Sequence, residues 1–176
     1  IMISDLFFID KNYLNAKNFV SPSEVDVPFE PTPSDLEILR DTTHYRVFEV
    51  NGNMSNARTS YFHQSIGGYS AVKPRRMQQL FDYQIAKNNM EVLNMLNTKY
   101  ILSPDSTGQL ASQTNPGALG NAWFVKSINV VPTADDALNG ISKIDPRTVA
   151  LVEQKDASFV PATSFKTDGS IQLTEY

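Results

Sequence analysis

The feature that most constrains the fold is a long amphipathic helical pattern between two strand-like runs. Its apolar positions recur at i, i+3, i+4 and i+8: Met77, Leu80, Phe81 and Ile85. This pattern predicts helices from Arg75 to Leu96, with a restart at Asn89, which can cap the second helix. Residues 45–50 before it and 98–102 after it are rich in β-branched and aromatic residues, which favour strands.

The same alternation continues towards the C-terminus. Thr133 is placed to cap a short helix with Asp136 at its third position, and Gly140 can end it. Strands are expected on both sides of that helix. We therefore predict a single soluble α+β domain with helices packed mainly on one face of a mixed sheet. The sheet is expected to contain four strands: Tyr45–Val50, Thr98–Leu102, Ala122–Val131 and Thr148–Val152.

Three segments are expected along the chain. Residues 1–30 form a membrane-proximal segment and a proline-rich tether, residues 31–165 form the α+β domain, and residues 166–176 begin a truncated β element. The dense apolar cluster at 1–9 has two interpretations, a buried first element of the domain or the trailing end of a membrane helix. Thr32, followed by proline and then by Asp35 at the third position, predicts the first helix of the domain.

Composition and motifs exclude several classes of function. Fifteen basic and nineteen acidic residues give a net charge of −4, so no nucleic-acid partner is expected. The chain has no cysteine, and its histidines, His44 and His63, do not form a metal-binding pair, so we predict no metal site. No nucleotide-binding or serine-hydrolase motif occurs. We accordingly predict no cofactor and no catalytic residue within this chain.

The candidate site is the aromatic and glycine-containing loop at residues 60–69, together with the start of the Arg75 helix. Five residues are predicted to contact a ligand there: Tyr61, His63, Tyr69, Arg75 and Arg76. Aromatic rings can stack on a sugar face, a neutral histidine can bond a hydroxyl, and arginine suits an anionic substituent. The alternative is a packed corner, in which the glycines permit a tight turn and the arginines are solvated.

Three strings in this order resemble one known family. They are Ser60-Tyr61-Phe62-His63-Gln64-Ser65-Ile66-Gly67-Gly68-Tyr69, Val92-Leu93-Asn94-Met95-Leu96-Asn97-Thr98-Lys99-Tyr100 and Gly120-Asn121-Ala122-Trp123-Phe124-Val125. Together they resemble the extracytoplasmic part of the YfhO-type family of bacterial polytopic membrane proteins. The similarity extends over residues 5–152.

The resemblance implies a role outside the chemistry of this chain. Members of the family look like glycosyltransferases of the GT-C class, whose catalytic carboxylate lies in an outer loop that this chain lacks. The chain is then expected to be a non-catalytic domain on the extracytoplasmic or periplasmic side of the bacterial inner membrane. Its expected partners are the membrane-embedded remainder of its own chain and an acceptor glycan or cell-envelope polymer. An interaction or assembly domain without transferase activity is the alternative.

Overall fold

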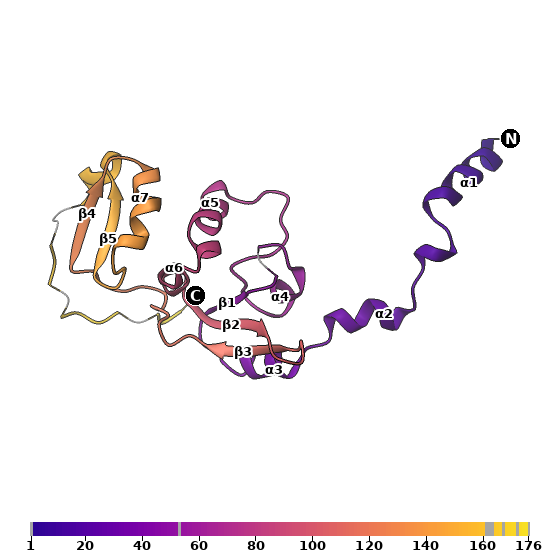
Figure 1. The fold of residues 1–176 in the computed structure, drawn as a ribbon, viewed down its shortest axis with the longest axis horizontal. Coiled ribbons are helices and arrows are strands. Elements are labelled where there is room, and N and C mark those ends of the chain that lie inside the picture. Colours follow the sequence, from indigo (N-terminus) through magenta and orange to yellow (C-terminus); the bar gives the residue numbers. More distant parts are fainter. Residues whose placement is uncertain (1, 53, 161–163, 167, 172, 176) are drawn as a thin grey trace.

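A computed structural model describes residues 2–52, 54–160, 164–166, 168–171 and 173–175. It contains helices, a three-stranded sheet and a separate two-stranded sheet, so the predicted α+β class is confirmed (Figure 1). The three-stranded sheet forms the centre of the molecule. The two-stranded sheet lies to one side of it, and the N-terminal helices extend away on the other.

The central sheet is mixed, as predicted. It contains β1 (Arg46–Glu49), β2 (Thr98–Pro104) and β3 (Leu110–Thr114) in the order β1-β2-β3. β1 runs parallel to β2, and β2 pairs antiparallel with β3 through a hairpin. A parallel pair needs a long crossover connection. Residues 50–97 supply it, and they also carry the candidate site.

Helices cover mainly one face of this sheet. α5 (Arg75–Tyr83), η3 (Ile85–Lys87) and α6 (Met90–Met95) follow one another along that face. Their apolar side chains pack around Phe48 in one core cluster that includes Ile85, Val92 and Leu93. The opposite face carries Val47 and is covered by the short helix α3 (Pro33–Ile38) through Ile38. Neighbouring residues of β1 therefore point into different clusters, as the alternation of a strand requires.

The predicted single sheet of four strands is wrong in one respect, because the last two strands form their own sheet. β4 (Ser127–Val131) and β5 (Val149–Glu153) pair in parallel and are connected by α7 (Ala134–Gly140) and η4 (Ile141–Lys143). Residues 122–126 were predicted as strand but lie before β4. In this run Trp123 donates from Nε1 to the carbonyl of Pro146 at 2.8 Å, and the backbone N–H of Lys126 donates to the carbonyl of Thr148 at 2.7 Å just before the ladder begins.

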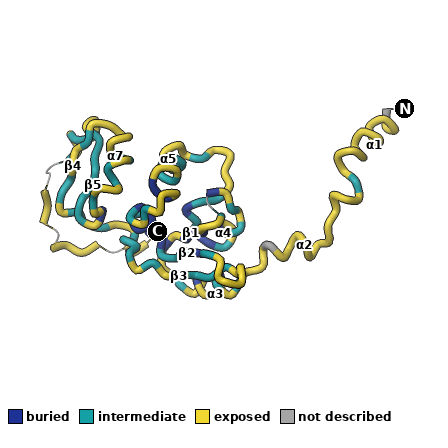
Figure 2. The backbone as a smooth tube through the Cα atoms, viewed as in Figure 1, coloured by how far each residue is buried: buried dark blue, intermediate teal, exposed yellow. Residues whose placement is uncertain are grey.

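The N-terminal segment is helical and stands apart from the sheets. It contains α1 (Met2–Tyr13), η1 (Ala16–Asn18), α2 (Pro22–Asp26) and η2 (Val27–Phe29). The interpretation of residues 1–9 as a buried first element is wrong for the described side chains, which are exposed; Phe8, for example, is 66% exposed (Figure 2). Ser21 caps α2 with Pro22 at its first position. In the proline-rich tether, η2 ends at Phe29, and the backbone of Glu30 and Thr32 is extended as expected.

The C-terminal residues contain η5 (Gln154–Phe159) and a single bridge from Ser164 to Ser127. The truncated β element expected at 166–176 does not appear as a strand at the described residues there, and residues 167, 172 and 176 lie outside them. None of the helices in the described part of the chain has the length and apolar character needed to cross a membrane.

Candidate functional site

A short helix that the sequence analysis missed builds the candidate site. α4 (Ala57–Phe62) is capped by Asn56, whose side chain accepts a hydrogen bond from the backbone N–H of Arg58 at 2.8 Å. Its Thr59 donates to the buried carboxylate of Glu49, which fixes the helix against β1. The end of α4 therefore faces the segment that connects α3 to β1.

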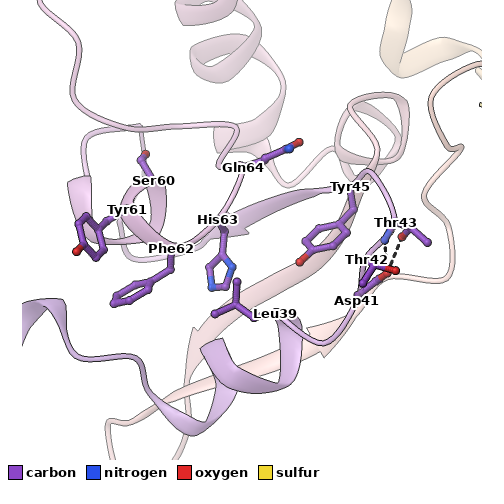
Figure 3. Close-up of a pocket in the computed structure, with 10 residues that line it drawn as sticks. All are labelled: Leu39, Asp41, Thr42, Thr43, Tyr45, Ser60, Tyr61, Phe62, His63 and Gln64. Carbon is purple, nitrogen blue, oxygen red and sulfur yellow. Dashed lines mark hydrogen bonds between the residues drawn. The ribbon is translucent and has the colours of Figure 1, made fainter. Parts of the chain in front are cut away.

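An open cavity of about 370 Å³ lies between these two segments (Figure 3). A volume of this size is within the range of small-ligand pockets. One wall consists of residues 60–64 and the other of residues from the end of α3 to the start of β1. The lining residues are Leu39, Asp41, Thr42, Thr43, Tyr45, Ser60, Tyr61, Phe62, His63 and Gln64.

Asp35 is the buried anchor behind the His63 wall. It is the third residue of α3, and its Oδ2 accepts hydrogen bonds from the backbone N–H of Thr32 at 2.7 Å and the Thr32 hydroxyl at 2.6 Å. Arg58 forms an ion pair with the same carboxylate and lies 4.9 Å over the ring of Phe62. Burial alone would raise the pKa of Asp35, but these donors together with His63 hold that pKa well below its usual range.

His63 connects this anchor to the cavity. Its Nε2 lies 2.9 Å from Oδ1 of Asp35, and its side chain is fully buried. The imidazole projects between the rings of Phe62 and Tyr45 and above Leu39 (Figure 3). Its second nitrogen, Nδ1, has no hydrogen-bond partner among the residues that the structure describes. Buried polar atoms normally have a partner, so this one requires an explanation.

Asp41 occupies the opposite wall and is held as an anion. Burial again acts to raise its pKa. It is outweighed by hydrogen bonds from Lys99, from the hydroxyl and N–H of Thr43, and from Tyr100, so the pKa lies well below its usual range. The Tyr100 hydroxyl donates to Asp41 at 2.8 Å, and burial together with that bond raises the pKa of Tyr100 to about 12.

These charge states limit the chemistry of the cavity. A glycoside hydrolase needs one carboxyl group that stays protonated to act as the general acid. Asp35 and Asp41 are both kept ionised, and their oxygens already accept several hydrogen bonds. They therefore suit the fixing of neighbouring side chains, and the cavity combines aromatic surface with fixed polar groups, which suits binding.

The aromatic side chains are themselves held in place. Tyr61 packs edge-on against Phe29, with ring centroids 5.0 Å apart, and against Phe62 at 4.9 Å. Tyr45 donates from its hydroxyl to the carbonyl of Ile38 at 2.9 Å. Rings that are fixed before binding lose little conformational freedom on contact with a ligand.

Comparison of the chain with protein-family models, with curated proteins and with solved structures finds no match. The role of the cavity is therefore inferred from its own geometry and from the resemblance in the three strings. Within the described ranges, no group of three or more histidine or acidic side chains is arranged to hold a metal ion.

The structure brings together two of the five predicted site residues. Tyr61 and His63 line the cavity. Tyr69 is 80% exposed and does not line it. Arg75 is exposed at the start of α5, and the 81% exposed side chain of Arg76 lies 3.7 Å from Glu153 in β5. The space next to residues 60–64 thus opens towards α3 rather than towards α5.

Sequence reasoning missed the second wall. Asp41, Thr43 and Tyr45 precede the predicted loop by 15 to 19 positions and carry no motif. One local signal was available for the first wall. Asn56 precedes a run without glycine or proline, and an asparagine in that position is a common helix start. No local signal connects Asp35 to His63, which meet only through the packing of α3 against α4.

Proposed function

We propose that this chain is a non-catalytic extracytoplasmic domain of a polytopic membrane protein that resembles GT-C glycosyltransferases, and that it contacts an acceptor glycan or polymer. The observation that carries the binding role is the cavity between residues 39–45 and 60–64, where aromatic rings stand beside fixed polar groups. Such a combination suits a sugar, whose faces stack on rings and whose hydroxyls take directional hydrogen bonds.

The family resemblance supports the placement of this domain on a membrane protein. One of the three resembling strings, residues 60–69, forms the end of α4 and part of the cavity wall, and another, residues 92–100, forms most of α6 and the start of β2. The parent sequence tests this placement. About a dozen apolar spans of roughly 20 residues around this domain would support the placement, and a free-standing exported chain would contradict it.

The binding role is tested by NMR titration of the ¹⁵N-labelled chain with neutral trisaccharides, namely maltotriose, cellotriose and chitotriose. We expect at least one of them to shift the signals of residues 39–45 and 60–64. Tyr61→Ala should weaken that binding about three- to tenfold, as expected for loss of an aromatic contact. Tyr69→Ala is the matched control, since Tyr69 belongs to the same string but lies outside the cavity.

Two results contradict the binding role. If none of the sugars shifts cavity signals at millimolar concentration, the cavity does not receive a neutral glycan. If Tyr69→Ala weakens binding while Tyr61→Ala does not, the site is instead the groove next to α5 that the sequence suggested.

An assembly domain without transferase activity is the second candidate. The observation in its favour is the exposed apolar surface of α1, including Ile3, Phe7 and Phe8. Replacing Phe7 and Phe8 with serine in the full-length parent should then reduce its assembly, while Tyr61→Ala leaves assembly intact. The opposite pattern, with polymer transfer reduced only by Tyr61→Ala, favours the glycan-contacting domain.

A further inference from the structure

We infer that Nδ1 of His63 accepts a hydrogen bond from a ligand hydroxyl, and that Asp35 makes this possible by fixing the proton of the imidazole on Nε2. The inference rests on the proposed function, because it names the group that would select a hydroxyl-bearing ligand in the cavity. It makes His63 a specificity-determining residue and Asp35 a positioning residue.

The first step is the identity of the donor between His63 and Asp35. Asp35 is held ionised, so its Oδ1 can only accept at the 2.9 Å contact with Nε2. The proton of this contact must therefore be on Nε2 of the imidazole.

The second step concerns the charge of the imidazole. Arg58 already pairs with Asp35 and supplies one positive charge to this buried carboxylate. A protonated His63 would add a second buried positive charge with no further carboxylate partner among its described contacts. Such a charge is costly in a protein interior. The neutral ring is favoured, and with a proton on Nε2 its Nδ1 is an acceptor.

The third step is the direction of that acceptor. Nδ1 is buried and has no hydrogen-bond partner in the described part of the chain, and His63 is one of the residues that line the cavity. The imidazole is fully buried between Phe62 and Tyr45, so a ligand hydroxyl reaches it only when one of the side chains beside it moves aside (Figure 3). A ligand donor at this position satisfies the buried atom, whereas an aliphatic or anionic group at the same position leaves it unpaired.

The tautomer can be measured on the unmodified chain without any ligand. Ring ¹⁵N and ¹H NMR distinguishes Nε2–H, Nδ1–H and doubly protonated imidazoles, and the chain has only two histidines, His44 and His63. The variant His63→Gln assigns the signals by removing one set. We expect His63 to be the Nε2–H tautomer at pH 7. Finding the Nδ1–H tautomer or an imidazolium overturns the inference.

Asp35→Asn should exchange the donor and acceptor roles of the two ring nitrogens of His63. The three donors from Thr32 and Arg58 at Oδ2 should retain an oxygen there, which turns the amide NH₂ towards Nε2 of His63. Nε2 then becomes the acceptor and the proton moves to Nδ1, so two donors face each other at the cavity. Trisaccharide binding should fall about tenfold or more, together with a switch of the imidazole to the Nδ1–H tautomer.

His63→Gln is the second variant in case Asp35→Asn does not fold. The glutamine amide can keep a donor to Asp35 at the position of Nε2, but it has no acceptor at the position of Nδ1. We expect a folded chain with about tenfold weaker trisaccharide binding. Unchanged affinity in His63→Gln contradicts the inference even when the tautomer is as expected.

The outcomes separate this inference from the proposed function. If a trisaccharide shifts Tyr61 and Thr43 signals but leaves Nδ1 of His63 unshifted, the cavity binds the sugar and the histidine does not select it. If no trisaccharide shifts any cavity signal, the proposed function fails and the inference fails with it.

Discussion

Asp35 shows how one buried carboxylate determines the local structure of the candidate site. It caps its own helix through Thr32, pairs with Arg58 and holds His63, and it has no exposed side-chain surface. Removing one member of a buried ion pair leaves the other charge without compensation. Thr32 caps α3, Arg58 belongs to α4 and His63 directly follows α4, so the loss weakens the contact between two elements as well as removing a charge.

Asp35→Ala should therefore lower the free energy of unfolding by about 3–5 kcal/mol. The control is Asp82→Ala on the exposed side of α5, where the carboxylate accepts a hydrogen bond from Gln78 and a change within about 0.5 kcal/mol is expected. Urea denaturation followed by circular dichroism measures both. Equal effects of the two substitutions contradict the role of Asp35 as an anchor.

Acid should destabilise the chain through the same carboxylates. The pKa values of Asp35 and Asp41 are lower in the folded state than in the unfolded state, so the unfolded state binds more protons below about pH 4. Their contribution to stability is complete above the unfolded pKa and is lost as the pH falls towards the folded pKa.

Asp41→Asn tests this dependence. The wild-type chain should lose about 1 kcal/mol more stability than the variant between pH 7 and pH 3, because the variant has no proton to gain at this position. Urea denaturation at the two pH values gives the difference. If the variant loses as much stability as the wild type, Asp41 does not contribute to the acid dependence.

At the scale of secondary structure, local signals predicted elements better than they predicted partners. The caps at Thr32, Asn89 and Thr133 start helices as the sequence indicated, because each cap depends only on the following three residues. The sheet partner of β4 depends on residues some twenty positions away, and the strand pattern alone did not reveal that β4 and β5 form a sheet of their own. The same limit applies to the second cavity wall, which packing brings to His63.

Two glycines provide a matched test of how the elements approach one another. A Cβ on Gly117 would lie 2.8 Å from the Asn94 amide, and a Cβ on Gly140 would lie 2.8 Å from a methyl of Leu151. The Asn94 amide is buried and accepts a hydrogen bond from Asn115 at 2.8 Å, so it cannot move without loss. The Leu151 methyl is the end of a flexible side chain.

Gly117→Ala should lower stability by about 1–3 kcal/mol, as expected for overpacking beside a bonded group. Gly140→Ala should be neutral or stabilising by up to about 1 kcal/mol, because alanine is the better residue inside α7. Thermal and urea denaturation measure whether each variant is less or more stable than the wild type. A loss of stability in both variants indicates that Leu151 is as tightly held as Asn94.

At the scale of the whole molecule, the cavity depends on a short part of the N-terminal segment. α1 and α2 extend away from the sheets and are exposed (Figures 1 and 2). Phe29, by contrast, packs against Tyr61, and the carbonyl of Glu30 accepts a hydrogen bond from Arg58 at 3.2 Å. The part of the N-terminal segment that supports the cavity therefore begins between Asp26 and Phe29.

Two deletions locate that boundary. Deleting residues 2–26 should change the free energy of unfolding by less than about 0.5 kcal/mol, because nearly all side chains of residues 3–26 are exposed and Phe29 stays in place. Deleting residues 2–30 should cost about 1–2 kcal/mol, since it removes the Phe29–Tyr61 contact and the acceptor for Arg58. It should also weaken trisaccharide binding, because Tyr61 loses its support. Urea denaturation measures the stability of both deletions, and NMR titration measures their trisaccharide binding. Equal stability of the two deletions would show that Phe29 and Glu30 do not support the cavity.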